Sequence, residues 1–494
     1  MTTPREIELK FDLDPAAADA LAKHPLFHGL PIDAVLAWSI YYDTAKSTLR
    51  KAGVTLRVRR SGDGFVQTVK ADAKGGAGLF DRAEWETTVA NGEPDLALID
   101  GTAAGPLLQG DDAQLRPLFE TDIQRRRWTL VHDQAEIEIL LDRGEIVAGK
   151  RRLAVAELEL ELRAGSAAAL FALARQLNAT IPLRLGVLTK SEQGYRLLRA
   201  KRAGVVKAEA ITIDRGATAG DGFAAIAFAC IRHLRLNEPR VLDARDAAAL
   251  HQTRVALRRL RSAFTIFSPI VAGAESDTLR GELGWISAVL GEARDLDVFI
   301  GKDWAAKAGK TVGARIAAER ERAYDEAIAA LDSQRFRGGM IDLAAWIATG
   351  SWRAVDNKAR SQPLEAFAAA ALDRFWKKVK KGGRELTAID DEARHEVRIA
   401  GKKLRYATEF FDDLHDGSKR RKARRRFMAA LEGMQADLGD LNDMVTAREL
   451  SQTLSRRIGF DLDPGSIDGP AREKLLASAE RAHARLVAQG PFWQ

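Results

Sequence analysis

The 494-residue chain contains a single cysteine, and it has no long apolar run. Cys230 cannot form a disulfide within the chain, which fits a reducing compartment. No apolar stretch approaches the roughly 20 residues that cross a bilayer, and the N-terminus shows no basic-then-apolar signal segment. These absences argue against a membrane partner and make a cytoplasmic location the default expectation.

Common catalytic signatures are also missing. No P-loop and no Ser-His-Asp or Cys-His arrangement is visible in the sequence, so nothing indicates a covalent nucleophile. The length predicts two or more domains, and 46% apolar and 29% charged residues are typical of a soluble globular protein.

The net charge of +7 is unevenly distributed. Residues 1–200 contain 26 Lys and Arg against 28 Asp and Glu, whereas residues 201–494 contain 50 against 41. The C-terminal part is therefore the basic one, which permits a polyanionic partner there without naming it.

Charged residues occupy every second position in several segments of the first third of the chain. The first segment places Glu6, Glu8 and Lys10 on one face of an extended strand. Five later segments repeat the pattern: Arg57 and Arg59; Glu84 and Glu86; Arg125 and Arg127; Glu136 and Glu138; Glu157, Glu159 and Glu161. One such pair alone is typical of a solvated strand face. Six together indicate a charged interior that suits an anion bound with a divalent metal.

Period-two alternation predicts a closed, mainly antiparallel barrel followed by a helical domain. The expected strands are 4–13, 35–43, 54–61, 64–71, 80–89, 118–131, 135–142 and 154–163. Residues 61–64 and 142–144 are interpreted as hairpin turns, and Asp14 and Ser166 as helix N-caps. Because the apolar side chains would point outward, helices must cover the barrel. From about residue 215 the period becomes 3.6 and predicts helices only.

The helical part contains an internal repeat. Residues 251–261 match residues 395–405 at an offset of 144, and residues 290–295 match 438–443 at an offset of 148. Each copy places four side chains within an arc of about 80° on one helix face. They are His251, Arg254, Arg258 and Arg261 in the first copy, and His395, Arg398, Lys402 and Arg405 in the second. A solvated basic face explains one such stripe, whereas its duplication favours a long polyanionic ligand.

The charged segments of residues 3–200 resemble the CYTH domain, the family of triphosphate tunnel metalloenzymes. The resemblance is carried by the following motifs: Glu6-x-Glu8-x-Lys10, Tyr42-Asp43-Thr44, Leu56-Arg57-Val58-Arg59, Lys70, Arg82-x-Glu84-Trp85-Glu86, Arg125-x-Arg127, Glu136-x-Glu138 with Asp142, Glu157-x-Glu159-x-Glu161 and Thr189-Lys190-Ser191. It implies an eight-stranded antiparallel β tunnel with flanking helices that binds a linear triphosphate and Mg²⁺ or Mn²⁺.

The resemblance also implies roles for individual residues. Metal ligands would be Glu6, Glu8, Glu159 and Glu161, with Glu157 ranked lower because it is expected near a tunnel mouth. Phosphate oxygens would be bound by Lys10, Arg57, Arg59, Lys70, Arg125, Arg127 and Lys190. Candidates that orient these bases or position water are Glu84, Glu86, Glu138 and Asp142. The pattern does not distinguish Glu136 from Glu138, because both share one face.

The helical repeats resemble the CHAD domain over roughly residues 215–490, through the twice-repeated motif His-x-x-Arg-x-x-x-(Arg/Lys)-(Arg/Lys)-Leu-Arg. This resemblance implies an all-α pair of pseudo-symmetric four-helix bundles that binds long-chain inorganic polyphosphate through the two basic stripes. Nucleic acid is the competing polyanion. It is disfavoured because the basic helices lack interleaved aromatic residues and no DNA-reading motif is present.

Together these patterns predict a multidomain α+β protein with a tunnel domain at 1–205 and a helical domain at 206–494. The expected activity is metal-dependent hydrolysis of tripolyphosphate to pyrophosphate and phosphate, in a cytoplasmic protein that could associate with polyphosphate granules. Two rival hypotheses stay open. One is another tunnel chemistry, that of an adenylate cyclase, a thiamine triphosphatase or a nucleoside triphosphatase. The other is a non-catalytic polyphosphate-binding scaffold, which the intact acidic strands disfavour.

Overall fold

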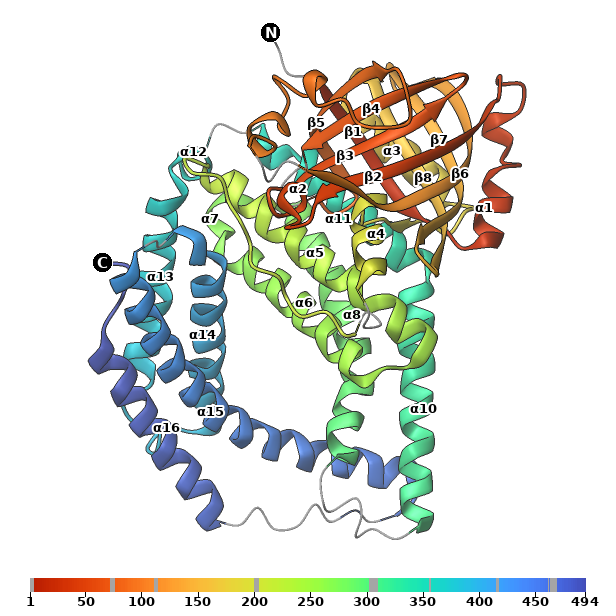
Figure 1. Cartoon of the computed structure of the whole chain (residues 1–494). Helices are drawn as coiled ribbons and strands as arrows, with labels where there is room; N and C mark the ends of the chain where they lie inside the picture. Colours follow the sequence, from red (N-terminus) through yellow and green to blue (C-terminus); the bar gives the residue numbers. More distant parts are fainter. Residues whose placement is uncertain are drawn as a thin grey trace. The chain divides into compact units, whose positions relative to one another are not determined.

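Eight antiparallel strands close into a barrel (Figure 1). The computed structural model describes residues 4–71, 76–110, 114–199, 204–301, 310–354, 357–414, 417–460, 462 and 469–494. The strands are β1 (Arg5–Asp12), β2 (Asp33–Thr44), β3 (Val54–Ser61), β4 (Gly64–Ala71), β5 (Leu79–Val89), β6 (Leu115–His132), β7 (Ala135–Ala148) and β8 (Arg151–Ala164). They lie in the order β5-β4-β3-β2-β6-β7-β8-β1, and β1 pairs with β5 to complete the ring; the two-residue β9 (Arg184–Leu185) adds to β1. The predicted eight-stranded barrel is confirmed.

Short helices cover apolar barrel surface, and two of them, α1 (Pro15–Leu21) and α3 (Ala167–Asn178), follow the predicted caps. The others are α2 (Thr48–Lys51) and α4 (Lys190–Leu198). The carboxylate of Asp14 accepts a hydrogen bond from Ala17 N, and the hydroxyl of Ser166 accepts one from Ala168 N, so both N-caps are confirmed. Leu49 of α2 packs with Leu56, Val58 and other buried residues of the strands, which gives the outward-facing apolar side chains a core of their own.

The predicted turn at 142–144 is wrong. Strand β7 continues through these residues to Ala148, and the chain reverses only between Ala148 and Arg151. Gly144 has a φ of +155°, and a Cβ there would lie 1.9 Å from the carbonyl oxygen of Asp122. The glycine therefore permits close approach of the neighbouring strand rather than a turn.

One end of the barrel is filled by an apolar cluster. Tyr41, Phe119 and Ile123 pack there with Tyr195 of α4. Gly194 allows this packing, since a Cβ at that position would lie 2.1 Å from the ring of Phe119. The buried hydroxyl of Tyr195 donates to Asp43 Oδ2 at 2.8 Å and anchors the helix. Helix α4 thus presents its first residues, Lys190 and Ser191, to the barrel interior.

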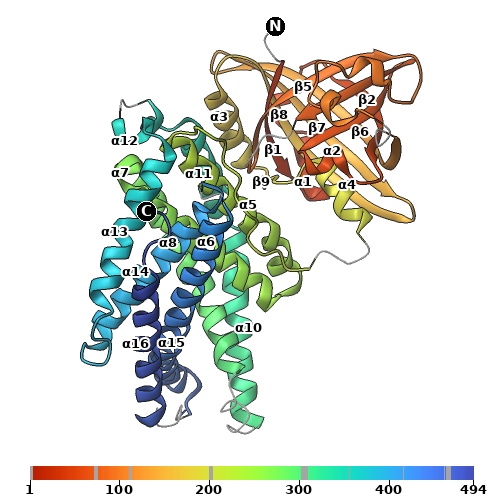
Figure 2. The same ribbon diagram turned by 60° about the vertical axis from the view of Figure 1, so that its left-hand side comes forward.

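The C-terminal region is all-helical, as predicted. Its helices are α5 (Ala219–Ala244), α6 (Ala247–Ile266), α7 (Ser268–Val271), α8 (Ala274–Ile300), α10 (Lys310–Asp332), α11 (Gln334–Thr349), α12 (Lys358–Ser361), α13 (Leu364–Gly382), α14 (Asp391–Phe410), α15 (Ser418–Ile458) and α16 (Gly469–Gln489). The two repeat copies begin on α6 and α14, which pack against each other; α6 also packs on α8, and α14 on α13 and α15. Figure 2 shows α13 to α16 side by side. None of the helices in the described ranges combines the length and apolar character needed to span a bilayer.

The contacts divide the chain into two units. One comprises Met1–Lys207 with Ile231–Leu236 and Asp332–Ser351, and the other comprises Ala208–Cys230, Asn237–Leu331 and Trp352–Gln494. The domain boundary at 205/206 stays a prediction.

Candidate functional site: a charged tunnel and a basic helix pair

A cavity of about 290 Å³ lies inside the barrel, and every side chain that lines it is charged or carries a hydroxyl group. The sequence-predicted residues that line it are Glu6, Glu8, Lys10, Arg57, Arg59, Lys70, Glu84, Glu86, Arg125, Arg127, Glu138, Glu159, Glu161 and Lys190. The lining contains nine Lys and Arg residues against seven Glu residues, so it is net cationic when all are ionised. Such an interior suits a multiply charged anion.

Cross-strand register explains how so many charges can be buried. Lys10 lies opposite Glu159, Arg125 opposite Asp142 and Lys70 opposite Glu84. Opposite charges at such positions attract each other across neighbouring strands. The Nζ of Lys70 accordingly lies 2.9 Å from a carboxylate oxygen of Glu84 and 2.7 Å from one of Glu6.

The deepest part of the cavity is a lysine-carboxylate network. The side chain of Lys10 is 1% exposed, and its Nζ lies 2.7 Å from Glu157 and 3.6 Å from Glu159. The Nζ of Lys190 lies 2.7–2.8 Å from Asp142, Glu157 and Glu159. Burial opposes ionisation of Lys190, but these carboxylates hold its pKa well above the usual range. Both ammonium groups are therefore fixed and charged at the closed end of the tunnel.

Asp142, like Glu157, is a predicted tunnel residue that does not line the cavity. It is fully buried, and its two carboxylate oxygens accept hydrogen bonds at 2.7 and 2.6 Å from Arg125 Nε and Nη2. Burial raises the pKa of Asp142, but Arg125 and Lys190 lower it below its usual value. Asp142 therefore orients two phosphate-binding candidates rather than contacting a ligand in the lumen.

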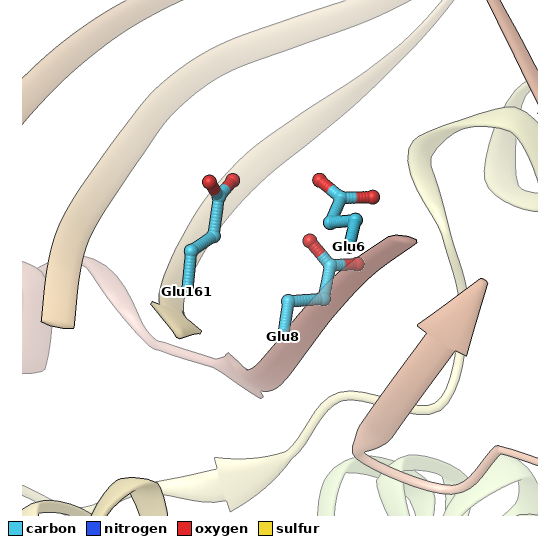
Figure 3. Close-up of side chains that lie close together, drawn as sticks. All are labelled: Glu6, Glu8 and Glu161. Carbon is cyan, nitrogen blue, oxygen red and sulfur yellow. The ribbon is translucent and has the colours of Figure 1, made fainter. Parts of the chain in front are cut away.

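Three glutamates form a compact carboxylate cluster. Glu6 and Glu8 of β1 and Glu161 of β8 each offer an oxygen atom, and these atoms lie within 4.8 Å of one another (Figure 3). Burial raises the pKa of Glu161 to about 8, with Glu6, Glu8 and Glu159 adding to the shift. Burial would also raise the pKa of Glu6, but Lys70 and Arg82 lower it to about 2.

This cluster fits a hard divalent cation. Carboxylate oxygens are the donors that Mg²⁺ and Mn²⁺ prefer, and crowding of negative charge at Glu161 is what such a cation would relieve. Glu159 lies outside the cluster, because its oxygens contact Lys190 at 2.8 Å and Arg125 at 3.2 Å. Its role as a metal ligand stays a prediction.

The structure distinguishes the candidates that the sequence left open. Glu138 is 8% exposed and lines the cavity, whereas its neighbour Glu136 is exposed to solvent. Glu157, expected near a tunnel mouth, is instead 2% exposed and contacts Lys10 and Lys190.

Two arginines were missed as site residues, although the period-two rule could have found both. Arg82 precedes Glu84 by two positions, and Arg163 follows Glu161 by two. The guanidinium of Arg82 contacts Glu6 at 2.9 Å and Glu8 at 2.7 Å. The hydroxyl-bearing lining residues Tyr41, Thr55, Thr189 and Ser191 were also missed. Thr55 lies two positions before Arg57 on β3, so the period-two rule could have found it.

The helical unit brings the two predicted basic stripes together, because α6 packs against α14. Arg258 Nε of the first copy donates a hydrogen bond of 2.7 Å to the hydroxyl of Tyr406, next to Arg405 in the second. Burial lowers the pKa of Lys402 to about 7, with Arg398, Arg258 and Arg405 adding to the shift. The stripes thus form one region with more positive charge than the protein itself neutralises.

The basic side chains of the two repeat copies have different contacts with the neighbouring helices. Arg254 Nη1 donates to the carbonyl of Ser287 at 3.2 Å, its guanidinium lies 3.9 Å from Asp295, and Gly291 leaves room for it on α8. In the second copy, His395 Nδ1 lies 2.9 Å from Asn442 Oδ1, at the position where the first copy has Arg294. Arg261 is exposed, which leaves it available to a ligand.

Comparison with known proteins gives two domain matches. Residues 4–195 match the CYTH domain model, and residues 225–452 match the CHAD domain model. An inorganic triphosphatase from Haemophilus influenzae is 29% identical over 195 residues, which are 39% of this chain and 55% of that protein. The chain thus spans about half the length of this curated relative.

Two solved structures are also similar. The CHAD domain from the plant Ricinus communis matches with 28% identity and a TM-score of 0.48, covering 58% of this chain and 97% of that one. A Hippeastrum adenylyl cyclase candidate, described as having a dominant triphosphatase activity, matches with 19% identity and a TM-score of 0.31. The match covers 38% of this chain and 93% of that one.

Replacing Asp142 by Asn should destabilise the barrel strongly. The change removes the charge that compensates Arg125 and Lys190, and breaking a buried ion pair costs about 3–5 kcal/mol. Urea unfolding followed by circular dichroism measures the loss. Asp122→Asn changes an exposed aspartate on β6 and should shift the unfolding midpoint little. Equal effects of the two substitutions would contradict the role given to Asp142.

Proposed function

Since the chain contains a CYTH domain followed by a CHAD domain, we propose that it is a metal-dependent inorganic triphosphatase with a second, polyphosphate-binding domain. The observation that carries the proposal is the barrel cavity that combines a three-glutamate cluster with nine cationic side chains. Tripolyphosphate is a linear anion that needs no apolar or aromatic contact, and every described lining residue is charged or bears a hydroxyl group.

The proposed division of labour follows the contacts. Glu6, Glu8 and Glu161 would hold Mg²⁺ or Mn²⁺, and Glu159 is the fourth candidate. When bound, the cation would polarise phosphoryl oxygens and offset their charge. Phosphate oxygens would be bound by Lys10, Arg57, Arg59, Lys70, Arg125, Arg127 and Lys190.

Carboxylates beside these bases keep them in position. Glu84 holds Lys70, and Glu86 lies 3.2 Å from Arg59. Glu138 contacts Arg127 at 3.5 Å and is the candidate nearest to Glu161 in the strand register for positioning the attacking water. Because the bases are already oriented, little reorganisation is needed as charge develops on the transferred phosphoryl group.

For the helical domain we propose binding of long-chain polyphosphate along His251, Arg254, Arg258, Arg261, His395, Arg398, Lys402 and Arg405. The pKa values of Arg254, Arg398 and Lys402 are each lowered first by burial and also by the neighbouring Arg258, which supports an anionic ligand there. Association with polyphosphate granules in the cytoplasm would follow from this binding.

Replacing Glu8 by Gln should lower phosphate release from tripolyphosphate at least about 100-fold, because the metal site loses a charged ligand. The assay compares tripolyphosphate, ATP and thiamine triphosphate, with Mg²⁺ or Mn²⁺ and after chelation. Glu136→Gln, an exposed glutamate of β7, is the control and should retain activity. Preference for ATP or thiamine triphosphate would favour another tunnel chemistry, and no turnover of any substrate would favour a scaffold.

The single substitutions Arg254→Gln and Arg398→Gln should each weaken binding of long-chain polyphosphate about tenfold, because each removes a charge-assisted contact. Arg456→Gln, an exposed arginine on α15, should have little effect. Filter binding measures the polyphosphate affinity of these variants and of the control. Polyphosphate should also displace single- and double-stranded nucleic acid from the protein, and the reverse ranking would contradict the proposed ligand.

Binding of polyphosphate should tighten about tenfold as the pH falls from 8.5 to 6. The pKa of Lys402 is about 7, so its charged form becomes dominant over this range, and a polyanion favours that form. Lys402→Arg should flatten the dependence, because guanidinium stays charged throughout. The matched control is Lys377→Arg at an exposed position on α13. This variant should keep the pH dependence of polyphosphate binding. A pH profile unchanged by Lys402→Arg would contradict this assignment.

A further inference from the structure

Two arginines contact the carboxylate cluster, and they differ sharply in burial. Arg82 contacts Glu6 and Glu8, and its side chain is 7% exposed. Arg163 contacts Glu161 at 2.9 Å, and its side chain is 51% exposed. Lys70, 12% exposed, also contacts Glu6 at 2.7 Å. The cluster therefore has two enclosed counter-ions, Arg82 and Lys70, and one much more exposed counter-ion, Arg163.

Arg163 bridges two carboxylates with different proposed roles. Its Nη2 contacts Glu161, a cluster member, and also contacts Glu138, which faces Glu161 in the β7–β8 register. Arg163 itself lines the cavity. One guanidinium thus neutralises a proposed metal ligand and a proposed water-positioning residue together.

A divalent cation in the cluster would change this arrangement. It would supply the charge that Glu161 now receives from Arg163, and it would repel the nearby guanidinium. Arg82 has little room to leave, since it is enclosed between Glu6 and Glu8. Arg163 can leave at lower cost than Arg82, because its own side chain is 51% exposed and water can solvate the released guanidinium, while the cation compensates Glu161 in its place.

We propose that Arg163 is a positioning residue, which holds Glu161 and Glu138 in the metal-free tunnel and transfers its ion pair to the triphosphate when a divalent cation binds. The inference rests on the proposed function and adds to it the order in which the metal and the triphosphate bind. Metal binding releases a phosphate-binding group at the open end of the cavity, so metal and triphosphate favour each other's binding.

Arg163→Gln should change the two affinities in opposite directions. Mn²⁺ alone should bind about fivefold more tightly, because its competitor is gone, and a methylene-bridged tripolyphosphate analogue in saturating Mn²⁺ should bind about tenfold more weakly. Electron paramagnetic resonance of free Mn²⁺ measures the affinity for the metal, and isothermal titration calorimetry measures the affinity for the analogue, both on the full chain. Neither readout depends on turnover.

Arg127→Gln is the matched control for charge. Arg127 also lies in the accessible part of the cavity, with a side chain 39% exposed, and its acidic partners are Glu138 and Asp33 rather than Glu161. Its replacement should weaken the analogue yet leave the affinity for Mn²⁺ alone within about twofold. Arg163→Lys keeps the charge but not the guanidinium that contacts two carboxylates, so its affinity for Mn²⁺ alone should lie between those of the unsubstituted protein and Arg163→Gln.

Three results would overturn the inference: an unchanged Mn²⁺ affinity in Arg163→Gln, a loss of affinity for both ligands, or an equal gain in Arg127→Gln. Thermal unfolding monitored by circular dichroism identifies a variant that fails to fold, in which case Arg163→Lys must show the intermediate response. If the unsubstituted chain binds neither Mn²⁺ nor the analogue, the proposed function itself fails.

Discussion

The structure depends on one electrostatic constraint: charges that face a closed barrel must be neutralised by other charges on the same inner surface. Leaving even one uncompensated would cost several kcal/mol. The register of neighbouring strands meets this requirement by placing Lys10 opposite Glu159, Lys70 opposite Glu84 and Arg125 opposite Asp142. Apolar side chains are consequently forced outward, where short helices and strand faces bury them.

The same constraint leaves the tunnel suited to bind an anion together with a cation. Basic groups are held by carboxylates at fixed positions, so a phosphate chain meets oriented donors rather than mobile ones. Three carboxylates crowd together at Glu6, Glu8 and Glu161, and burial together with the neighbouring negative charges raises the pKa of Glu161 to about 8. In the helical unit the imbalance has the opposite sign, because the stripes of α6 and α14 meet with too few carboxylates between them. Both sites therefore attract the ion that their surroundings lack.

Much of the barrel and of its lining could be predicted, because period-two alternation assigns side chains to a face before any strand is paired. Glu6, Glu8, Lys10 and their counterparts needed nothing more. The failures have physical causes. Gly144 reads locally as a turn residue, yet the approach of Asp122 from the next strand determines its conformation. Arg163 continues the pattern of β8, but its importance lies in contacts with Glu161 and Glu138 that depend on register.

The sequence by itself determined which residues face the lumen, where helices replace strands and that the basic stripe occurs twice, since these follow from periodicity along the chain. Only the tertiary structure decided that Glu138 rather than Glu136 lies in the cavity, that Asp142 sits beneath it, and that the two stripes meet. It also separated Glu159 from the carboxylate cluster. The reason is geometric: a period gives the direction of a side chain, whereas strand register and helix packing set which charges come within contact distance.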